Sequence, residues 1–111
     1  ALRSPIMTLP NMWEFAGGKI EHGETLKEAI EREIKEELDC DIEFIDVFND
    51  NTHKYDKFIV NLITVKCRLV TGIPTACEHS KLIWLHRENL LSLNLATADM
   101  KAVNQLATGK L

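Results

Sequence analysis

The chain has 111 residues, of which 45% are hydrophobic and 27% are charged, and its formal net charge is −4. This length supports one domain, residues 1–111, with a single core, and it is too short for two. The acidic balance argues against a long nucleic acid as the partner. No apolar run reaches the length of a membrane span and no signal peptide is visible, so we expect no membrane partner and a cytoplasmic location. The three cysteines lack zinc-binding spacing and are expected to be reduced thiols.

The N-terminal part of the chain predicts short extended segments joined by loops. Residues 1–3 begin as though a strand were already under way, and residues 4–10 are loop-like because two prolines exclude regular ladder positions. Residues 12–15 alternate and include aromatic side chains, which predicts a short strand that ends at Gly17 and Gly18. The segment that follows connects this strand to a helix.

That helix is predicted to begin after Thr25, because Thr25 and Glu28 have the spacing of a capping box. It is expected to end near Asp39. Glycine is the more usual residue past a helix end, and aspartate adopts the left-handed conformation less easily. One face of the helix carries an apolar stripe formed by Leu26, Ile30, Ile34 and Leu38.

The last turns of this helix carry three glutamates, Glu33, Glu36 and Glu37. At about 100° per residue, these carboxylates lie within roughly 100° of one another. Like charges at this spacing repel, and burial of a carboxylate costs more still unless it is compensated. A hard divalent cation with oxygen ligands is the simplest compensation, so the helix is predicted to hold a metal ion. The alternative is a solvated charged helix face.

The middle of the chain predicts a pair of strands. Residues 42–48 alternate and are typical of a strand, and residues 49–52 form a cluster of turn-favouring residues. Residues 58–70 are the longest β-branched run, which indicates a central strand.

The C-terminal part predicts one more strand and a second helix. After a turn and a polar loop at residues 71–80, residues 81–85 predict a strand with Trp84 packed inward. Residues 89–95 predict a short helical or irregular piece, and residues 96–106 have helical spacing. Several short strands with two helices indicate an α+β domain with a mixed sheet between the helices.

The stretch from residue 17 to residue 42 resembles the Nudix box, the signature of the Nudix hydrolases. The matching positions are Gly18, Glu24, Arg32, Glu33, Glu36 and Glu37. The late glycine of the motif is Asp39 here, and Ala16 stands where proline usually precedes the paired glycines. The segments ALRSP…LPNMWEF, EHSKLIWL and ATADMKAV extend the resemblance over most of the chain. They look like the MutT-like branch, which cleaves nucleoside triphosphates to monophosphates and pyrophosphate.

The resemblance implies the Nudix-type fold, an α/β/α sandwich with a mixed β-sheet between helices. The sheet of this family normally begins with a strand hairpin ahead of the position of Ala1. That hairpin is missing from this sequence. If the protein itself lacks these strands, we expect an exposed sheet edge and poor stability.

The resemblance also implies a site for Mg²⁺ or Mn²⁺. Its ligands would be the backbone carbonyl of Gly18 and the carboxylates of Glu33, Glu36, Glu37 and Glu78. The residues assigned to catalysis are Glu33, Glu37, Arg32 and Glu78. Glu33 is the candidate that activates or orients the attacking water, and Glu78 either adds a metal contact or serves as the base. Arg32 is expected to hold a carboxylate such as Glu24 or Glu33 in place.

Four further residues are candidates for substrate binding. Arg3 and Lys19 are expected to contact phosphates, Arg3 by bidentate geometry and Lys19 as a point charge. Asp99 corresponds to the position where MutT-like proteins read the base edge, and a carboxylate there accepts hydrogen bonds from amino or imino groups. The alternative for Asp99 is a first-turn helix acid. Tyr55 is a candidate to stack on the base, although aromatic residues in strands usually pack in the core. His79 is either a proton shuttle or an inert loop histidine.

These residues predict a metal-dependent hydrolase of nucleoside triphosphates, with a possible role in sanitising oxidised or modified nucleotides. Two alternatives stay open: a Nudix hydrolase of ADP-ribose or capped RNA, and a non-catalytic Nudix module that binds nucleotides. The three glutamates argue against the second alternative, because a binding module has no need for such crowded charge.

Overall fold

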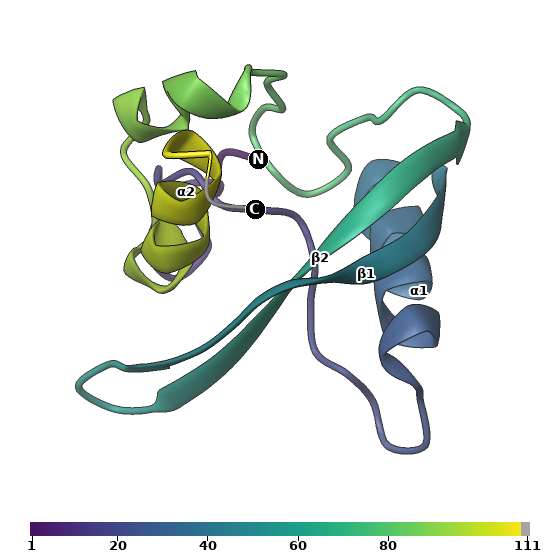
Figure 1. Ribbon diagram of the computed structural model, residues 1–111, viewed down its shortest axis with the longest axis horizontal. Helices are drawn as coiled ribbons and strands as arrows, with labels where there is room; N and C mark the ends of the chain where they lie inside the picture. Colours follow the sequence, from purple (N-terminus) through teal and green to yellow (C-terminus); the bar gives the residue numbers. More distant parts are fainter. Residues whose placement is uncertain (110–111) are drawn as a thin grey trace.

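The helix that carries the three glutamates begins and ends where its sequence predicts. The computed structural model describes residues 1–109, and its helix α1 comprises Leu26–Leu38 (Figure 1). The Thr25 hydroxyl accepts a hydrogen bond from the Glu28 backbone N–H, and the Glu28 carboxylate accepts one from the Thr25 backbone N–H. Both halves of the predicted capping box are therefore formed.

Asp39 ends α1 in the left-handed conformation, with φ 51° and ψ 44°. Its backbone N–H donates to the carbonyl of Lys35 at 3.1 Å. Asp39 thus takes the conformation that glycine usually supplies at this position, and the helix exit keeps its ordinary geometry despite the substitution.

The sheet is a long antiparallel hairpin of β1, Asp41–Lys54, and β2, Ile59–Thr71. The turn lies at residues 55–58, where the Tyr55 N–H donates to the Phe58 carbonyl at 2.8 Å. Strand β2 agrees with the strand predicted at residues 58–70. Three register shifts interrupt the pairing along β1, and they are typical of β-bulges.

The turn predicted at residues 49–52 is wrong, because these residues continue β1. The side chains of Asn49 and Asn51 form hydrogen bonds with the C-terminal part of the chain instead of closing a local turn. The Asn49 amide donates to the Gln105 side chain at 2.9 Å, and the Asn51 amide donates to the Ala98 carbonyl at 3.4 Å. Turn-forming asparagines are thus used here as contacts between the hairpin and the C-terminal helix.

The two shorter predicted strands are each reduced to a single bridging residue. Trp13 pairs with Leu2 in antiparallel fashion and with Leu95 in parallel fashion, and Lys81 pairs with Leu2. The bridges combine both pairing directions, as in a mixed sheet, although β1 and β2 form the only continuous ladder in residues 1–109. Trp84 is 78% exposed, so its predicted inward packing is wrong. In the described segment 81–85, only Lys81 pairs with another residue, Leu2. Residue 84 lies beyond this bridge and outside any paired strand, so Trp84 is left exposed.

The C-terminal segment folds as three short helices. They are the 3₁₀ helices η1, Arg87–Ser92, and η2, Thr97–Asp99, and the α-helix α2, Met100–Ala107. The helix predicted at residues 96–106 is therefore divided into a 3₁₀ turn and an α-helix. Both α1 and α2 contact β1, and they lie at different parts of the hairpin (Figure 1).

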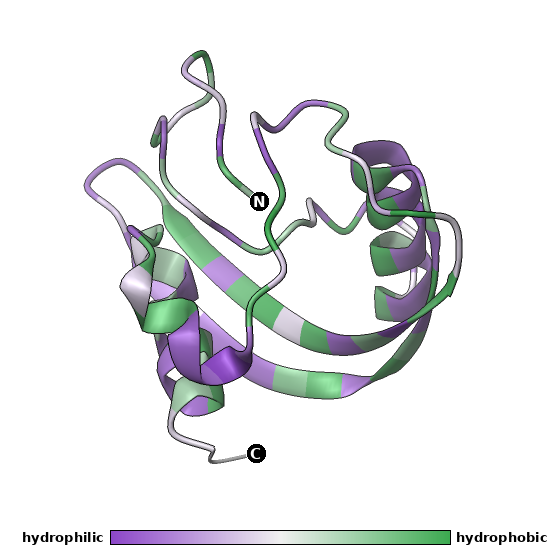
Figure 2. Ribbon diagram, turned by 90° about the horizontal axis from the view of Figure 1, so that it is seen from above, coloured by the Kyte–Doolittle hydropathy of each residue, from purple (hydrophilic) through white to green (hydrophobic). Residues whose placement is uncertain are grey.

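The buried apolar side chains form two groups, one on each side of the molecule. The group at α1 consists of Ala29, Ile34 and Cys40, and the group at α2 consists of Ala96, Ala98, Ala102 and Val103. Figure 2 shows that the hydrophobic residues of α1 lie on the side that faces the middle of the molecule. Helices on a hairpin with bridging segments form the α+β architecture that the sequence predicts.

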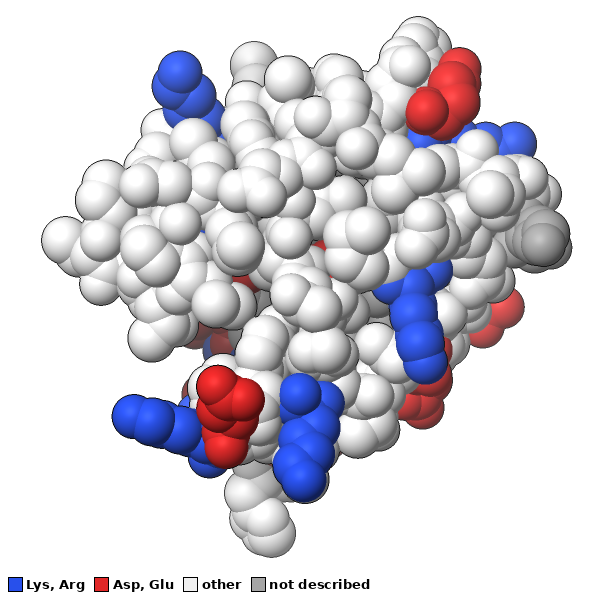
Figure 3. All heavy atoms as spheres, turned by 90° about the vertical axis from the view of Figure 1, so that its left-hand side faces the viewer, with Lys and Arg blue, Asp and Glu red and all other residues white. Residues whose placement is uncertain are grey.

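No helix in the described part of the chain is both long enough and apolar enough to cross a membrane. On the face seen in Figure 3, the lysine and arginine side chains lie apart from one another and form no continuous basic stripe. Proteins that bind a long nucleic acid usually present such a stripe.

The left-handed end of α1 allows a test of backbone strain. Replacing Asp39 by glycine removes the steric cost of a left-handed residue with a side chain, so we expect Asp39→Gly to raise the free energy of unfolding by about 0.5–1 kcal/mol in urea denaturation. Thr108, which ends α2 at φ −89°, provides the control, because Thr108→Gly relieves no strain and should not stabilise the protein. A loss of stability in Asp39→Gly would contradict this explanation.

Candidate active site

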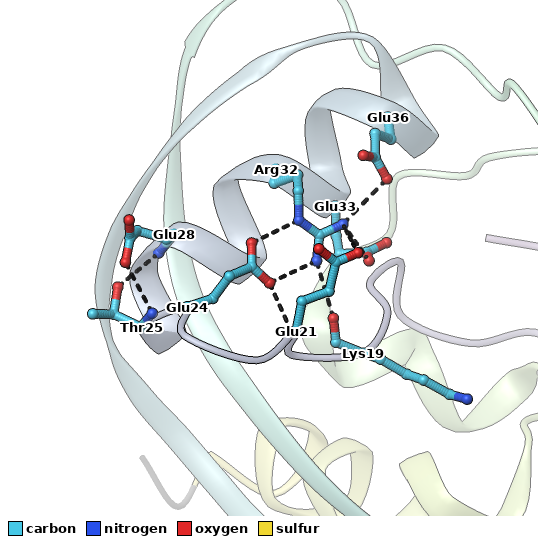
Figure 4. A network of polar contacts seen from close by, with 8 residues as sticks. All are labelled: Lys19, Glu21, Glu24, Thr25, Glu28, Arg32, Glu33 and Glu36. Atoms are coloured by element: carbon cyan, nitrogen blue, oxygen red, sulfur yellow. Dashed lines mark hydrogen bonds and ion pairs between the residues drawn. The ribbon is translucent and has the colours of Figure 1, made fainter.

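Arg32 holds together the acidic residues of α1 and of the loop that precedes it (Figure 4). Its Nε and Nη2 donate to the two carboxylate oxygens of Glu24 at 2.7 and 2.9 Å. Its Nη1 donates to Glu33 at 2.8 Å and to Glu36 at 3.3 Å. The Nη2 group also donates to the backbone carbonyl of Lys19 at 3.0 Å. The contacts with Glu24 and Glu33 are those that the sequence analysis expects of Arg32.

The bidentate pair between Arg32 and Glu24 fixes the loop on the helix. The guanidinium hydrogen bonds lower the pKa of Glu24 to about 2, well below the ordinary value of 4.5. The Glu24 carboxylate also accepts a hydrogen bond from the Glu21 backbone N–H at 2.8 Å. The loop that carries the paired glycines is therefore tied to α1 by charge-assisted hydrogen bonds.

Glu33 lies directly against the backbone of Gly18. A Cβ atom placed on Gly18 would be 2.3 Å from the Glu33 carboxyl carbon, far inside contact distance. A side chain at this position would displace the Glu33 carboxylate from its present place. Two of the predicted metal ligands, the Gly18 backbone and the Glu33 side chain, are thus neighbours.

Glu37 turns from the end of α1 toward Gly17, whose backbone N–H donates to its carboxylate at 3.1 Å. Burial raises the pKa of Glu37, an effect that the Gly17 hydrogen bond and His79 oppose and that Glu33 enhances. The three glutamates consequently differ in environment: Glu33 and Glu37 meet the glycines, whereas the Glu36 side chain is 60% exposed.

The described residues contain no group of three Asp, Glu, His or Cys side chains that is gathered as a metal site. The donor set nevertheless suits Mg²⁺ or Mn²⁺, because carboxylate and carbonyl oxygens are the ligands that hard divalent cations prefer. Burial of Glu37 without a neighbouring cation raises its pKa, and a bound cation would offset this cost. To gather all three glutamates, the Glu36 side chain would have to turn from its present position.

A cleft of about 1110 Å³ runs between the N-terminal segment, α1, β2 and the start of α2. Among the residues proposed from sequence, those that line it are Arg3, Gly18, Lys19, Glu33, Glu37 and Asp99. Those that do not line it are Arg32, Glu36, Tyr55 and Glu78. The volume suffices for a nucleotide-sized ligand.

Asp99 is a buried acid in this cleft, with 6% of its surface exposed. Its carboxylate accepts a hydrogen bond from the Phe15 backbone N–H at 3.3 Å. Burial raises the pKa of Asp99 to about 6. Asp99 is the acidic residue in the first turn of η2 and forms no side-chain cap at the start of α2, so the alternative of a first-turn helix acid stays open.

Glu14 is a residue of the cleft that the sequence analysis missed. It accepts a hydrogen bond from Arg3 at 2.8 Å and lies 2.9 Å from Nε2 of His79, whose side chain is 2% exposed. The signal in the sequence is an acid within a short aromatic strand just ahead of the paired glycines. Such an acid needs partners, and those partners come from remote parts of the chain.

Three other candidates have different surroundings. The Lys19 side chain extends away from the Arg32 network in Figure 4. The Tyr55 hydroxyl accepts a hydrogen bond from the Ala98 backbone N–H at 3.0 Å, and its ring packs edge-on against His53. Tyr55 thus links the hairpin to the C-terminal helices. Glu78 is exposed in the loop beside His79. Roles for Tyr55 and Glu78 in binding or catalysis stay predictions.

Comparison with known proteins identifies the family. Residues 2–106 match the NUDIX domain. The chain belongs to the NUDIX family. It is 33% identical to CTP pyrophosphohydrolase of Escherichia coli K12 over 89 residues, which are 80% of this chain and 66% of that protein. It is 30% identical to putative 8-oxo-dGTP diphosphatase 2 of Mycobacterium tuberculosis over 103 residues, which are 89% of this chain and 71% of that protein. The chain thus spans just under two thirds of the E. coli relative.

Solved structures agree with this assignment. The NMR structure of DNA mismatch repair protein MutT from methicillin-resistant Staphylococcus aureus 252, a Nudix hydrolase, is 48% identical, with a TM-score of 0.75 over 98% of this chain and 84% of that one. The MutT protein of Methanosarcina mazei Go1 has a TM-score of 0.85 over 98% of this chain and 81% of that one. At 21% identity, this second match shows the fold alone. The MutT-like Nudix fold and an enzyme of the Nudix type, both predicted from sequence, are confirmed.

The raised pKa of Asp99 predicts a pH-dependent contribution to stability. Its folded-state pKa is about 6 against an ordinary 3.8, so in this pH window the folded protein binds more protons than the unfolded chain, and stability falls as the pH rises. Above the window, ionised Asp99 costs on the order of 3 kcal/mol.

Asp99→Asn keeps an acceptor for the Phe15 N–H and removes that charge. We therefore expect it to raise the free energy of unfolding at about pH 7.5 and to leave it nearly unchanged at about pH 4, as measured by urea denaturation. An equal difference at both pH values would show that Asp99 does not titrate in this window.

Proposed function

We propose that this protein is a metal-dependent hydrolase that converts (deoxy)nucleoside triphosphates to the monophosphate and pyrophosphate. The observation that carries the proposal is the meeting of Glu33 with Gly18, and of Glu37 with Gly17, within one cleft. The relatives named CTP pyrophosphohydrolase and 8-oxo-dGTP diphosphatase support the same reaction class.

In this proposal, Mg²⁺ or Mn²⁺ is held by the Gly18 carbonyl and by Glu33, Glu36 and Glu37, with Glu78 as a further predicted ligand. When bound, such an ion screens the charge of the phosphates and lowers the pKa of a coordinated water. The glutamates supply oxygen ligands of the type that these ions prefer. Lys19 adds a point charge at the edge of the cleft where the phosphates would lie.

Glu33 is the residue proposed to orient the attacking water. Arg32 binds its Oε1 atom, which leaves Oε2 to accept a hydrogen bond from a water and to receive its proton. Because Arg32 is itself fixed by both oxygens of Glu24, the Glu33 carboxylate is held in one orientation before substrate binds. Arg32 therefore acts by positioning Glu33 and does not contact the substrate.

Asp99 is proposed to read the base. Its carboxylate lies in the same cleft as Glu33 and accepts hydrogen bonds from amino or imino groups, such as N4 of cytosine. An oxidised purine also offers donors on its edge. A protein that removes such nucleotides from the pool would act in the cytoplasm and would protect DNA from their incorporation.

A product panel tests the proposed function. The protein is incubated with Mg²⁺ and with dNTPs, NTPs, 8-oxo-dGTP, ADP-ribose or dinucleoside polyphosphates, and the products are identified with an EDTA control. We expect a nucleoside monophosphate and pyrophosphate from at least one triphosphate, with no turnover in EDTA. Turnover of ADP-ribose alone would reject the assignment, and nucleotide binding without turnover would identify a non-catalytic module.

Glu37→Gln separates catalysis from folding. Glutamine keeps an oxygen that accepts the Gly17 N–H, yet it removes the charge that a metal ion needs. We expect turnover to fall by at least about 10²–10³-fold, the loss typical of one electrostatic group. Without metal, the free energy of unfolding should be unchanged or slightly higher, because a partly buried charge is gone.

The matched control is Glu31→Gln, which removes one charge from the same helix at a residue that does not line the cleft; Glu31 pairs with Lys27 and accepts a hydrogen bond from the Phe44 backbone N–H. It should retain turnover. Equal rates for Glu37→Gln and Glu31→Gln would remove Glu37 from the mechanism.

A further inference from the structure

Glu14 connects two segments that are distant in the sequence. Its Oε1 accepts a hydrogen bond from Nη1 of Arg3 at 2.8 Å, and its Oε2 lies 2.9 Å from Nε2 of His79. Both carboxylate oxygens are thus engaged, one with each partner. Arg3 and Glu14 are mostly buried, and His79 is almost fully buried.

These contacts fix the plane of the Arg3 guanidinium. On one side, Nε donates to the Thr8 carbonyl at 2.5 Å and Nη2 donates to the Thr8 hydroxyl at 3.0 Å. On the other side, Nη1 donates to Glu14. A guanidinium has five N–H groups, so about two remain for another partner, and Arg3 lines the cleft.

His79 is held in place through its backbone neighbours. The Ser80 N–H donates to the Leu2 carbonyl at 2.9 Å, and the Leu2 N–H donates to the Lys81 carbonyl at 2.8 Å. The loop that carries His79 is therefore fixed beside the residue that precedes Arg3.

The ring nitrogen Nδ1 of His79 is buried without a hydrogen-bond partner among the described residues. A buried N–H without an acceptor is costly, so the proton is assigned to Nε2, which faces Glu14. His79 is thus a donor to the carboxylate that binds Arg3.

We propose that His79 is a positioning residue for Arg3. By donating from Nε2 to Glu14, it holds that carboxylate where Glu14 orients the Arg3 guanidinium, and the remaining N–H groups of Arg3 then contact the phosphates of a nucleotide in the cleft. A free arginine side chain loses rotamer entropy when it binds a ligand. The hydrogen bonds from His79 to Glu14 and from Arg3 to Glu14 fix the Arg3 side chain in advance, so this entropy is already lost before the ligand binds. The identity of the ligand rests on the proposed function.

Substitutions at His79 test whether it acts through Arg3. In His79→Gln the amide nitrogen can take the place of Nε2 and keep a donor to Glu14, whereas His79→Leu removes the donor. The control is His86→Leu, because His86 is exposed at the start of η1 and makes no side-chain cap. Affinity for a non-hydrolysable CTP analogue with a methylene α,β-bridge is measured by calorimetry with Mg²⁺, and KM and kcat are measured with CTP.

We expect His79→Leu to weaken analogue binding and to raise KM by about tenfold, with kcat changed by less than about twofold, the pattern of lost ground-state binding. His79→Gln and His86→Leu should stay within about twofold of the wild type. In an Arg3→Ala background, His79→Leu should have no further effect. An equal effect of His79→Leu with and without Arg3 would overturn the proposal.

A measurement without ligand separates this proposal from the proposed function. The NMR signal of the Arg3 Nε–H should be sharp in the wild type and in His79→Gln, and it should broaden in His79→Leu. Glu14→Gln, which weakens the same link, should broaden it too and serves if His79→Leu does not fold. An unchanged Arg3 signal in these variants would overturn the positioning role. If the wild type hydrolyses no triphosphate, the proposed function fails, and the Arg3 signal still decides the role of His79.

Discussion

The guanidinium of Arg32 is the interaction on which the candidate site depends. It joins Glu24 in the loop to Glu33 on the helix, so the paired glycines and the glutamate-bearing face of α1 form one unit. The hydrogen bonds are charge-assisted and bidentate, which makes them both strong and directional. Without this bond the loop would be connected to α1 only by the chain itself and by contacts such as the hydrogen bond from Gly17 to Glu37, and the approach of Glu33 to Gly18 would lose its fixed geometry.

Two arginines are fixed in similar ways, Arg3 in the cleft and Arg32 outside its lining. Arg32 binds the carboxylate of Glu33, and Arg3 is itself held by the carboxylate of Glu14. In both places a planar group with several donors is fixed by more than one acceptor, so its orientation is set before any ligand arrives. The cleft lies between the two groups of buried apolar side chains, and these polar contacts fix charged side chains on its lining and beside it.

Local signals in the sequence predicted α1 and its caps, because the capping box and the apolar stripe act over a few residues. The motif spacing likewise predicted the contact between Arg32 and Glu24. The extent of β1 was not predictable in this way, since Asn49 and Asn51 favour turns locally and are held in the strand by the C-terminal segment. Glu14 was missed for the same reason: its partner His79 is 65 residues away, and no pattern within the strand reveals it.

The Asp99 carboxyl group can display two hydrogen-bonding patterns near neutral pH. When ionised it only accepts, and it then matches an amino or imino edge. When protonated, which its pKa of about 6 permits in mildly acidic conditions, it presents one donor beside one acceptor. If Asp99 reads the base as proposed, the acidity of the surroundings alters which nucleobase edge is complementary to this carboxyl group.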